Sequence, residues 1–157
     1  MNPLLYNVKY NIVSPALRNI GLYSPSAINL VTGTGLRESA YQTKRQYDGG
    51  PALGWWQMEP FTENDCWENF LAYRPMLARL IERTCGVYGP SPESLENNNA
   101  YAAIMCRIKY YRSPLPLPSS NNAEDLAEYW KNIYNSELGA GSVDDYTVSL
   151  FKEAIDT

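Results

Sequence analysis

The stretch "GLRESAYQTKRQYDGGPALGWWQMEP", residues 35–60, joins the end of a helical pattern to a segment rich in turn-forming residues. Glu38 and Ser39 close the helical pattern, and the run Gly-Trp-Trp-Gln follows about fifteen residues later. Residues 40–61 contain three glycines and two prolines, which predict a long loop or a small irregular hairpin. Long loops inside compact domains often carry function. The stretch therefore predicts both a break between helices and the place to search for a site.

Upstream of this stretch, two Ser-Pro pairs predict helix starts. The pair at 14–15 would begin a short helix that ends at Gly21, and the pair at 24–25 would begin a helix that runs to about Ser39. The segment 4–13 fits either a helix or an extended chain. The long loop thus follows the second predicted helix.

Downstream, start and stop signals recur every 10 to 25 residues. Predicted helices begin near Thr62, Pro75 (with a stop at Gly86), residue 97, Asn122 and Ser142. The proline-rich segment 113–122 cannot be helical and is interpreted as a surface crossing, and residues 136–142 are interpreted as a turn. The sequence predicts a mainly α single domain over residues 1–157, with about seven short helices.

Composition excludes several classes of function. The net charge is −4 and the isoelectric point about 4.8, and the 13 basic residues are scattered, so no nucleic-acid partner is expected. No apolar run approaches the ~20 residues of a transmembrane helix, and no membrane partner is expected. The first residues lack the pattern of a signal peptide.

Histidine is absent, which excludes Ser-His and Cys-His nucleophile pairs and histidine-based metal sites. Cys66, Cys85 and Cys106 have no metal-binding spacing and are interpreted as reduced core residues. Neither a metal nor a cofactor is expected. Any catalysis must come from carboxylates, tyrosines or amides.

Glu38 is the leading candidate for such chemistry. A glutamic acid can protonate the leaving oxygen of a glycosidic bond if burial among apolar groups raises its pKa. Gly33 and Gly35 precede it, and each costs about 1 kcal/mol relative to alanine inside a helix. Either another backbone or a ligand approaches the helix closely there, or the glycines merely fray its end.

The motifs "RES" (37–39), "GWWQM" (54–58) and "NNAYAAIMCRIKYY" (98–111) follow one another in the order of the lysozyme-like superfamily. The set most resembles Slt-type lytic transglycosylases. Small lysozyme-like proteins of tailed bacteriophages resemble the chain more closely still, since they share the same order, a "GxxQMEP" turn and a closing stretch like "YWKNIYNSELGAG" (129–141). The resemblance covers residues 24–141 and implies a lysozyme-like fold. It departs from the family in the glycines before Glu38 and in the Asn97–Asn99 run.

The resemblance also implies roles for individual residues. Glu38 would act first as general acid and then as general base, with Ser39 orienting its carboxylate. Gln57 would contact substrate amide or hydroxyl groups, and Tyr101 or Tyr134 would hydrogen-bond toward Glu38. An asparagine of the 97–99 run, taken as Asn99, would face the cleft.

The residues themselves leave alternatives open. Trp55 and Trp56 are consecutive, so on an extended segment they face opposite sides: one can pack inward while the other offers a ring to a sugar, or both belong to the core. Gln57 suits an acetamido group but is equally an ordinary loop residue. Tyr101 fits a buried helix stripe without any catalytic role.

A second carboxylate would decide between hydrolysis and transglycosylation. Asp48 lies in the loop, where it is either catalytic or a turn former, and Glu59 follows Gln57. Without a second carboxylate, the substrate's own N-acetyl oxygen or 6-hydroxyl would attack, as the resemblance implies.

The resulting hypothesis is a bacteriophage muramidase or lytic transglycosylase that cleaves the MurNAc–GlcNAc bond of a peptidoglycan strand. It would be made in the host cytoplasm and act at the cell wall, or be carried in the virion beside other virion proteins. The alternative is a structural virion protein that keeps the fold without turnover, and the acidic surface favours a particle component over a freely diffusing lysin.

Overall fold

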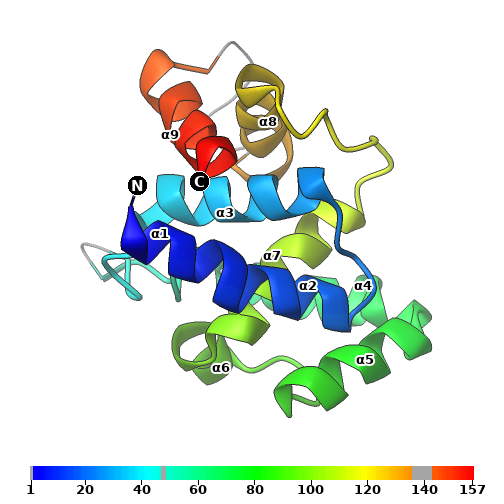
Figure 1. The fold of residues 1–157 in the computed structure, drawn as a ribbon. Helices are drawn as coiled ribbons and strands as arrows, with labels where there is room; N and C mark the ends of the chain where they lie inside the picture. Colours follow the sequence, from blue (N-terminus) through cyan, green and yellow to red (C-terminus); the bar gives the residue numbers. More distant parts are fainter. Residues whose placement is uncertain (1, 47–48, 136–142) are drawn as a thin grey trace.

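The computed structural model describes residues 2–46, 49–135 and 143–157. In these ranges the chain forms eight helical segments and one 3₁₀ turn, with no β-strand beyond two isolated bridges (Figure 1). The predicted mainly α class is confirmed. None of the described helices combines the length and hydropathy that crossing a bilayer requires.

The N-terminal helix is longer than predicted. Helix α1 (Pro3–Asn7), the π-helix η1 (Val8–Val13) and α2 (Ser14–Asn19) form one continuous segment. The cap is Asn2, whose side chain accepts a hydrogen bond from Leu5 N (3.1 Å), and Ser14 has helical backbone angles. The prediction of a helix start at Ser14 was wrong because Pro15 follows a π-helical stretch whose wider turns accommodate its missing N–H.

Helix α3 (Pro25–Ser39) is the central element and is buried on most of its surface. Ser24 caps it, as predicted, by accepting a hydrogen bond from Ala27 N (3.0 Å). Its two internal glycines mark close approaches: a Cβ on Gly33 would overlap the ring of Phe151, and one on Gly35 the ring of Tyr41. The glycines do mark close approaches, but the approaching groups are aromatic side chains and not the backbone or ligand that was predicted.

The segment after α3 is the small irregular hairpin that the sequence predicts. Its bridges pair Arg45 with Leu53 and Leu53 with Met58. Gly54 is required in it, because its φ is +78° and a Cβ there would strike the backbone carbonyl of Leu95. The hairpin thus packs closely against the backbone at Leu95.

Five elements follow the hairpin: α4 (Pro60–Asn69), the 3₁₀ turn η3 (Leu71–Tyr73), α5 (Pro75–Cys85), α6 (Pro92–Asn97) and α7 (Asn99–Tyr111). Helix α5 ends at Gly86 (φ +70°), as predicted. Helix α4 begins two residues before the predicted Thr62, because Pro60 suits a first-turn position. Helix α6 was not predicted, although Ser91 and Pro92 provide its start signal.

The last elements are α8 (Ala123–Tyr129), which continues into the π-helix η4 (Trp130–Tyr134), and α9 (Asp145–Asp156). Asn122 caps α8 as predicted, with its side chain accepting from Asp125 N (3.0 Å). The predicted turn at 136–142 and its cap Ser142 lie outside the described residues. Helix α9 is capped by Asp144, which accepts from Thr147 N (2.8 Å).

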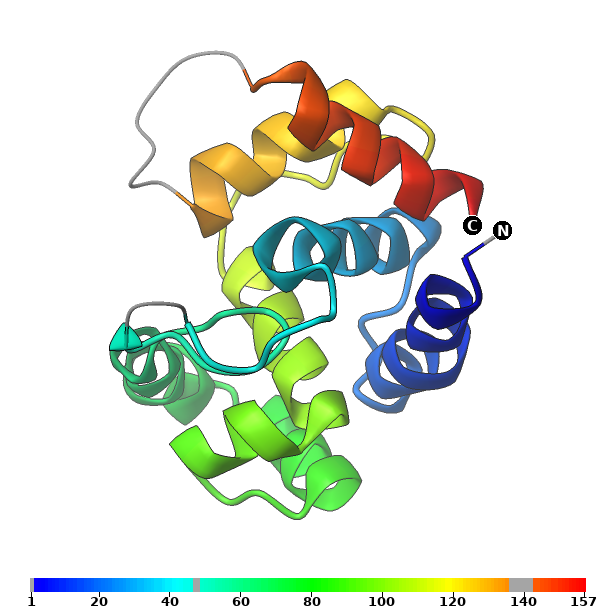
Figure 2. The same cartoon turned by 90° about the vertical axis from the view of Figure 1, so that its left-hand side faces the viewer.

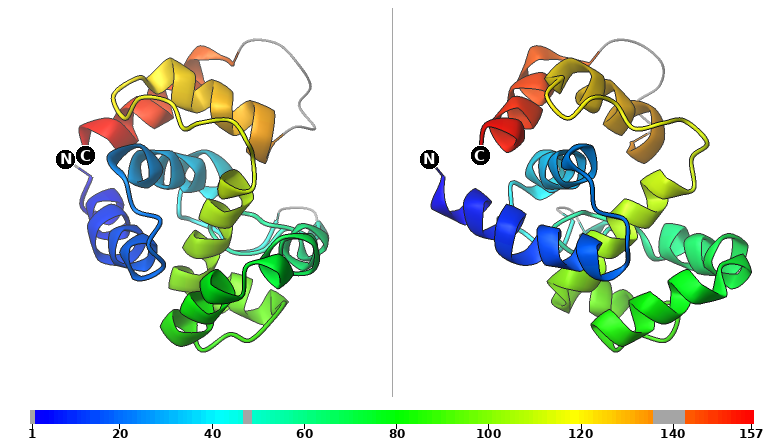
Figure 3. Two further views of the ribbon diagram at one scale, coloured as in Figure 1. Left: turned by 90° about the vertical axis from the view of Figure 1, so that its right-hand side faces the viewer. Right: turned by 45° about the vertical axis from the view of Figure 1, so that its right-hand side comes forward.

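Helix α3 lies between two layers (Figure 3). The N-terminal helix covers one side, and α8 and α9 lie side by side over the other, so the two termini come close together (Figures 2 and 3). Lys9, buried in the N-terminal helix, donates to the carbonyl of Ala154 in α9 (2.7 Å). Helices α4 to α7 lie on the side of α3 away from α8 and α9, and the C-terminal end of α3 faces the hairpin.

Candidate functional site

A pocket of about 360 Å³ lies where α3, the hairpin, α4, α7 and η4 meet. Its walls hold Glu38 of α3, Lys109 of α7, and Tyr134 and Asn135 at the end of η4. The hairpin contributes Gln46, Ala52, Gln57 and Met58, and the segment that opens α4 contributes Glu59, Phe61 and Thr62. Ligand pockets commonly measure about 300–1,000 Å³, so this one has room for a sugar ring and its substituents.

Glu38 stands in the last turn of α3 with its carboxyl group in the pocket. Its Oε2 accepts a hydrogen bond from the indole Nε1–H of Trp130 (3.0 Å), and the side chain of Asn135 also bonds to it. Burial raises the pKa of Glu38, while Trp130, Arg37 and Lys109 hold back part of the increase. The result is a carboxylic acid that keeps its proton to higher pH than an exposed glutamate.

Trp130 is fixed by its own neighbours. It is buried, its ring packs against Phe151 of α9 (centroids 6.4 Å apart), and the guanidinium of Arg37 lies 4.9 Å from its ring centroid. Arg37 in turn donates from Nε to the hydroxyl of Thr147 in α9 (3.0 Å). Helix α9 therefore supports the indole that positions Glu38.

Ser39 does not orient the carboxylate of Glu38. Its hydroxyl donates to the carbonyl of Trp55 (2.6 Å) and accepts from Tyr41 N (3.1 Å). These bonds tie the end of α3 to the hairpin at a point where Ala40 and Tyr41 both have positive φ. The predicted orienting role belongs instead to Trp130, with Asn135.

The two tryptophans do not face opposite sides, which was the prediction for an extended segment: their ring centroids are 6.3 Å apart and both rings lie edge-on to Tyr41. Trp56 is buried and donates from Nε1 to the carbonyl of Val31 (2.9 Å), so it is a core residue and its predicted contact with sugar was wrong. Trp55 is half-buried, lies edge-on to Tyr41, and has the ammonium of Lys44 4.9 Å from its ring centroid. Neither indole lines the pocket that contains Glu38.

Gln57 and Tyr134 do line the pocket. Gln57 has φ +49°, and its side-chain Nε2–H donates to the Gly54 carbonyl (2.9 Å). Its side-chain carbonyl has no hydrogen-bond partner within the described part of the chain. Tyr134 donates its hydroxyl to the carbonyl of Trp56 (2.5 Å), not to Glu38 as predicted. Gln57 can accept a hydrogen bond from a ligand, whereas Tyr134 fixes the hairpin against η4.

Tyr101 and Asn99 lie elsewhere. The hydroxyl of Tyr101, fully buried, bonds to the carboxyl group of Glu63 and accepts from Trp67 Nε1 (2.9 Å). Asn99 begins α7, ten residues before Lys109, which is about 15 Å along a helix. The prediction that these two residues contact substrate was wrong, because the pocket lies beside the C-terminal half of α7 and both residues belong to its N-terminal end.

Asp48, the predicted alternative for a second carboxylate, lies outside the described residues. Glu59 stands in the pocket wall, in an extended conformation just before α4. It is the second carboxylate that the described chain places in the same pocket as Glu38.

Lys109, Trp130 and Asn135 were not among the predicted site residues. Trp130 belongs to an apolar helical stripe typical of core packing, and Lys109 was predicted to point away from the stripe of its helix. Only the pairing of α3 with η4 and α7 reveals their position beside Glu38. The polar "YWKNIYN" run at 129–135 was the available signal for two of them.

Within the described ranges, no three His, Cys, Asp or Glu side chains gather to hold a metal ion. The cavity therefore offers carboxyl, ammonium and amide groups for its chemistry. Comparison of the chain with models of protein families, with curated proteins and with solved structures found no match. The functional assignment depends on the geometry of this pocket.

Proposed function

We propose that the protein cleaves the MurNAc–GlcNAc bond of peptidoglycan, with Glu38 as general acid and then general base. One observation carries the proposal: Glu38 is a partly buried carboxylic acid on the wall of a pocket that fits a sugar ring, and the indole of Trp130 donates a hydrogen bond to it. The resemblance of residues 24–141 to lysozyme-like sequences gives the same residue the same role. The site of action would be the bacterial wall, reached from a bacteriophage particle or from the host cytoplasm.

The chemistry follows from the proton on Glu38. The protonated carboxyl group gives its proton to the glycosidic oxygen, the C1–O bond breaks, and the freed alcohol leaves. The new carboxylate is stabilised by the Trp130 N–H and by the positive charges of Arg37 and Lys109. It then takes a proton from the nucleophile that attacks C1, which restores the acid.

The nucleophile decides the reaction class. Glu59 lies in the same pocket and can attack C1 itself, after which water, deprotonated by Glu38, displaces Glu59 from C1; this route would make the enzyme a hydrolase. Attack by the sugar's own 6-hydroxyl would instead leave a 1,6-anhydro end and would require Glu38 alone. Mass spectrometry of the released fragments separates these outcomes, since anhydro products are 18 Da lighter than hydrolysis products, one water molecule.

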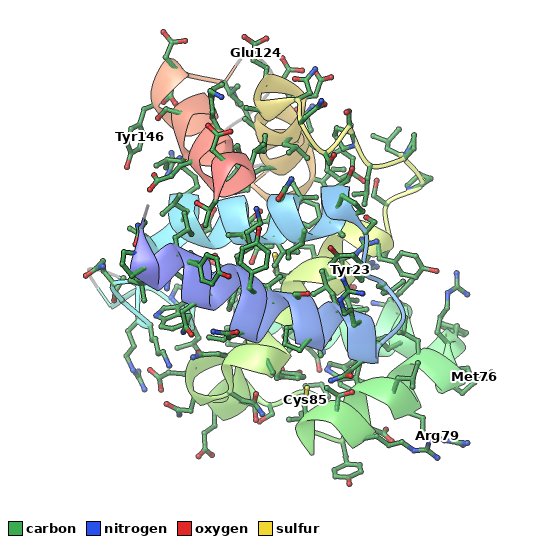
Figure 4. The ribbon with its side chains drawn as sticks, in the orientation of Figure 1. Tyr23, Met76, Arg79, Cys85, Glu124 and Tyr146 are labelled. Carbon is green, nitrogen blue, oxygen red and sulfur yellow. The ribbon has the colours of Figure 1, made fainter. Side chains whose placement is uncertain are left out.

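The test of the proposal is zymography on purified peptidoglycan with the wild type, Glu38→Gln and Glu124→Gln. Glu124 lies exposed at the outer end of α8, away from the pocket residues, and serves as the matched control (Figure 4). Removing the acid should reduce clearing by a factor of about 10²–10⁴, and the control should clear like the wild type.

Equal clearing by Glu38→Gln and wild type would contradict the assignment of the acid. If a correctly folded wild type clears no peptidoglycan over pH 4–8, the proposed enzymatic activity is contradicted. That result would favour a structural virion protein that keeps this fold.

A further inference from the structure

Lys109 presents an ammonium group in the wall of the pocket. Its Nζ donates to the carbonyl of Tyr134 (2.7 Å) and lies 4.4 Å from the centroid of that tyrosine's ring. This is its one hydrogen bond within the described ranges, and none of their carboxylates comes within ion-pair distance of it. An ammonium has three N–H donors, so two remain for a ligand in the cavity.

The position of Lys109 is costly without a ligand. Burial lowers the pKa of Lys109 by disfavouring its charged form, and the surrounding ionisable groups, Glu38 and Glu59 among them, oppose part of the decrease. A partly buried cation with unused donors is stabilised when an anion enters its site. It is also the one cation that the described residues place in the pocket wall.

We infer that Lys109 is the binding point for a carboxylate carried by the substituent on the muramic acid ring. The inference rests on the proposed function and makes it more specific. MurNAc differs from GlcNAc by a lactyl ether on O3, which ends in a carboxylate when the strand is free of peptide. In peptide-bearing strands the lactyl group is amidated, and the peptide supplies carboxylates of its own.

The chemistry gives the pocket a preference that Glu38 cannot provide. General acid catalysis at Glu38 acts on any β-1,4-linked N-acetyl sugar strand, including chitin, which has no carboxylate. A charge-assisted bond from Lys109 exists only with a muramic residue in place. Lys109 is therefore a specificity residue for the proposed reaction.

The experiment measures binding in the Glu38→Gln background, so that substrate survives. Isothermal titration or NMR uses three tetrasaccharide probes: chitotetraose, (GlcNAc–MurNAc)₂ with free lactyl carboxylates, and the same strand carrying its peptides. Adding Lys109→Met should weaken binding of a carboxylate probe about tenfold and leave chitotetraose unchanged. Lys109→Arg should keep most of the preference, since it keeps a cation and its donors.

Lys152→Met is the matched control, because Lys152 is 68% exposed on α9 and bonds to Asp156. It should leave all three affinities unchanged. If Lys109→Met loses affinity for the peptide-free strand, the lactyl carboxylate is the ligand. If Lys109→Met loses affinity only for the peptide-bearing strand, the peptide carboxylates are the ligand.

The inference is overturned if the Lys109→Met change lowers affinity for all three probes alike, or for none of them, while thermal denaturation shows a folded protein. It is also overturned if the parent protein does not prefer either carboxylate probe. Failure of the proposed function is a separate result, because that failure shows as the absence of clearing by the wild type in zymography.

Discussion

The proton on Glu38 is controlled by a small number of neighbours. Desolvation raises its pKa, and two directed hydrogen bonds, from the Nε1–H of Trp130 and from the side chain of Asn135, oppose the increase by stabilising the carboxylate. A general acid is active while protonated, so activity should decline as pH rises through this raised pKa. The alkaline limb of the pH–rate profile should therefore lie above 4.5, the ordinary value for glutamate.

Replacing Trp130 by phenylalanine tests this directly. The variant loses the N–H donor, so the pKa of Glu38 rises further and the alkaline limb of kcat/KM moves to higher pH. The smaller ring in a buried site should also reduce the free energy of unfolding by about 1–3 kcal/mol. Trp67→Phe loses an indole hydrogen bond to Tyr101 instead, and its limb should stay in place. A Trp130→Phe limb that moves to lower pH would contradict the role of the indole.

At the residue scale, the sequence predicted the acid but not its surroundings. Glu38 and Gln57 lie in the pocket because the end of α3 and the hairpin turn are local features that sequence signals define. Trp130 and Lys109 come from elements 70 to 90 residues away, and their approach depends on helix packing that no local pattern encodes. The family-derived role of Tyr101 failed for the same reason, since its partner is Glu63.

At the scale of elements, Glu63 joins α4 to α7 and to the loop before α6. Its carboxyl group is fully buried, with Oε2 accepting from Ser91 N (2.7 Å) and bonding to Tyr101, while Oε1 has no hydrogen-bond partner among the described residues. Burial raises its pKa, and the bonds from Tyr101 and Ser91 hold back part of the increase. At a pH between the ordinary pKa of glutamate and the raised pKa of Glu63, the folded protein thus retains a proton on Glu63 that the unfolded chain releases.

This predicts that stability falls with rising pH. Between the ordinary value of 4.5 and the raised folded-state pKa, the folded state binds more protons than the unfolded one, so the free energy of unfolding decreases by up to about 1.4 kcal/mol per pH unit for this group. Glu63→Gln should remove this share of the slope in urea titrations across pH 4–8. Glu68→Gln, on the exposed side of α4, should keep it. Parallel curves for Glu63→Gln and wild type would contradict the prediction.

Element boundaries show which sequence signals are reliable. The caps at Ser24 and Asn122 and the stop at Gly86 were confirmed, because each acts through its own backbone and the next turn. Ser14 failed because the π-helix before Pro15 allows one helix to continue past a start signal. The glycines of α3 could be predicted to mark close packing, but their aromatic partners, Phe151 and Tyr41, could not.

At the scale of the whole molecule, two groups of elements meet at the site. The α8–η4–α9 layer brings Trp130 and Asn135, and the hairpin with α4 and α7 brings Gln57, Glu59 and Lys109. Helix α3 runs between these two groups of elements (Figures 2 and 3), and Glu38 stands in its last turn. The proposed cleavage would therefore depend on the packing of α9 on α3, although α9 contributes no residue to the pocket wall.

The net charge of −4 makes a final prediction for the proposed reaction. Peptidoglycan is anionic, so an acidic enzyme is repelled from intact sacculi at low ionic strength, and salt screens that repulsion once the Debye length falls to about 8–10 Å. The initial rate of sacculus solubilisation, followed by turbidity, should therefore rise severalfold between about 10 and 150 mM NaCl. The double variant Glu124→Lys with Glu128→Lys brings the net charge from −4 to 0 through two exposed residues of α8 that are not in the pocket wall, and it should flatten this dependence. A wild-type rate that falls over the same range would show that local attraction at the pocket, not the overall charge, governs the encounter.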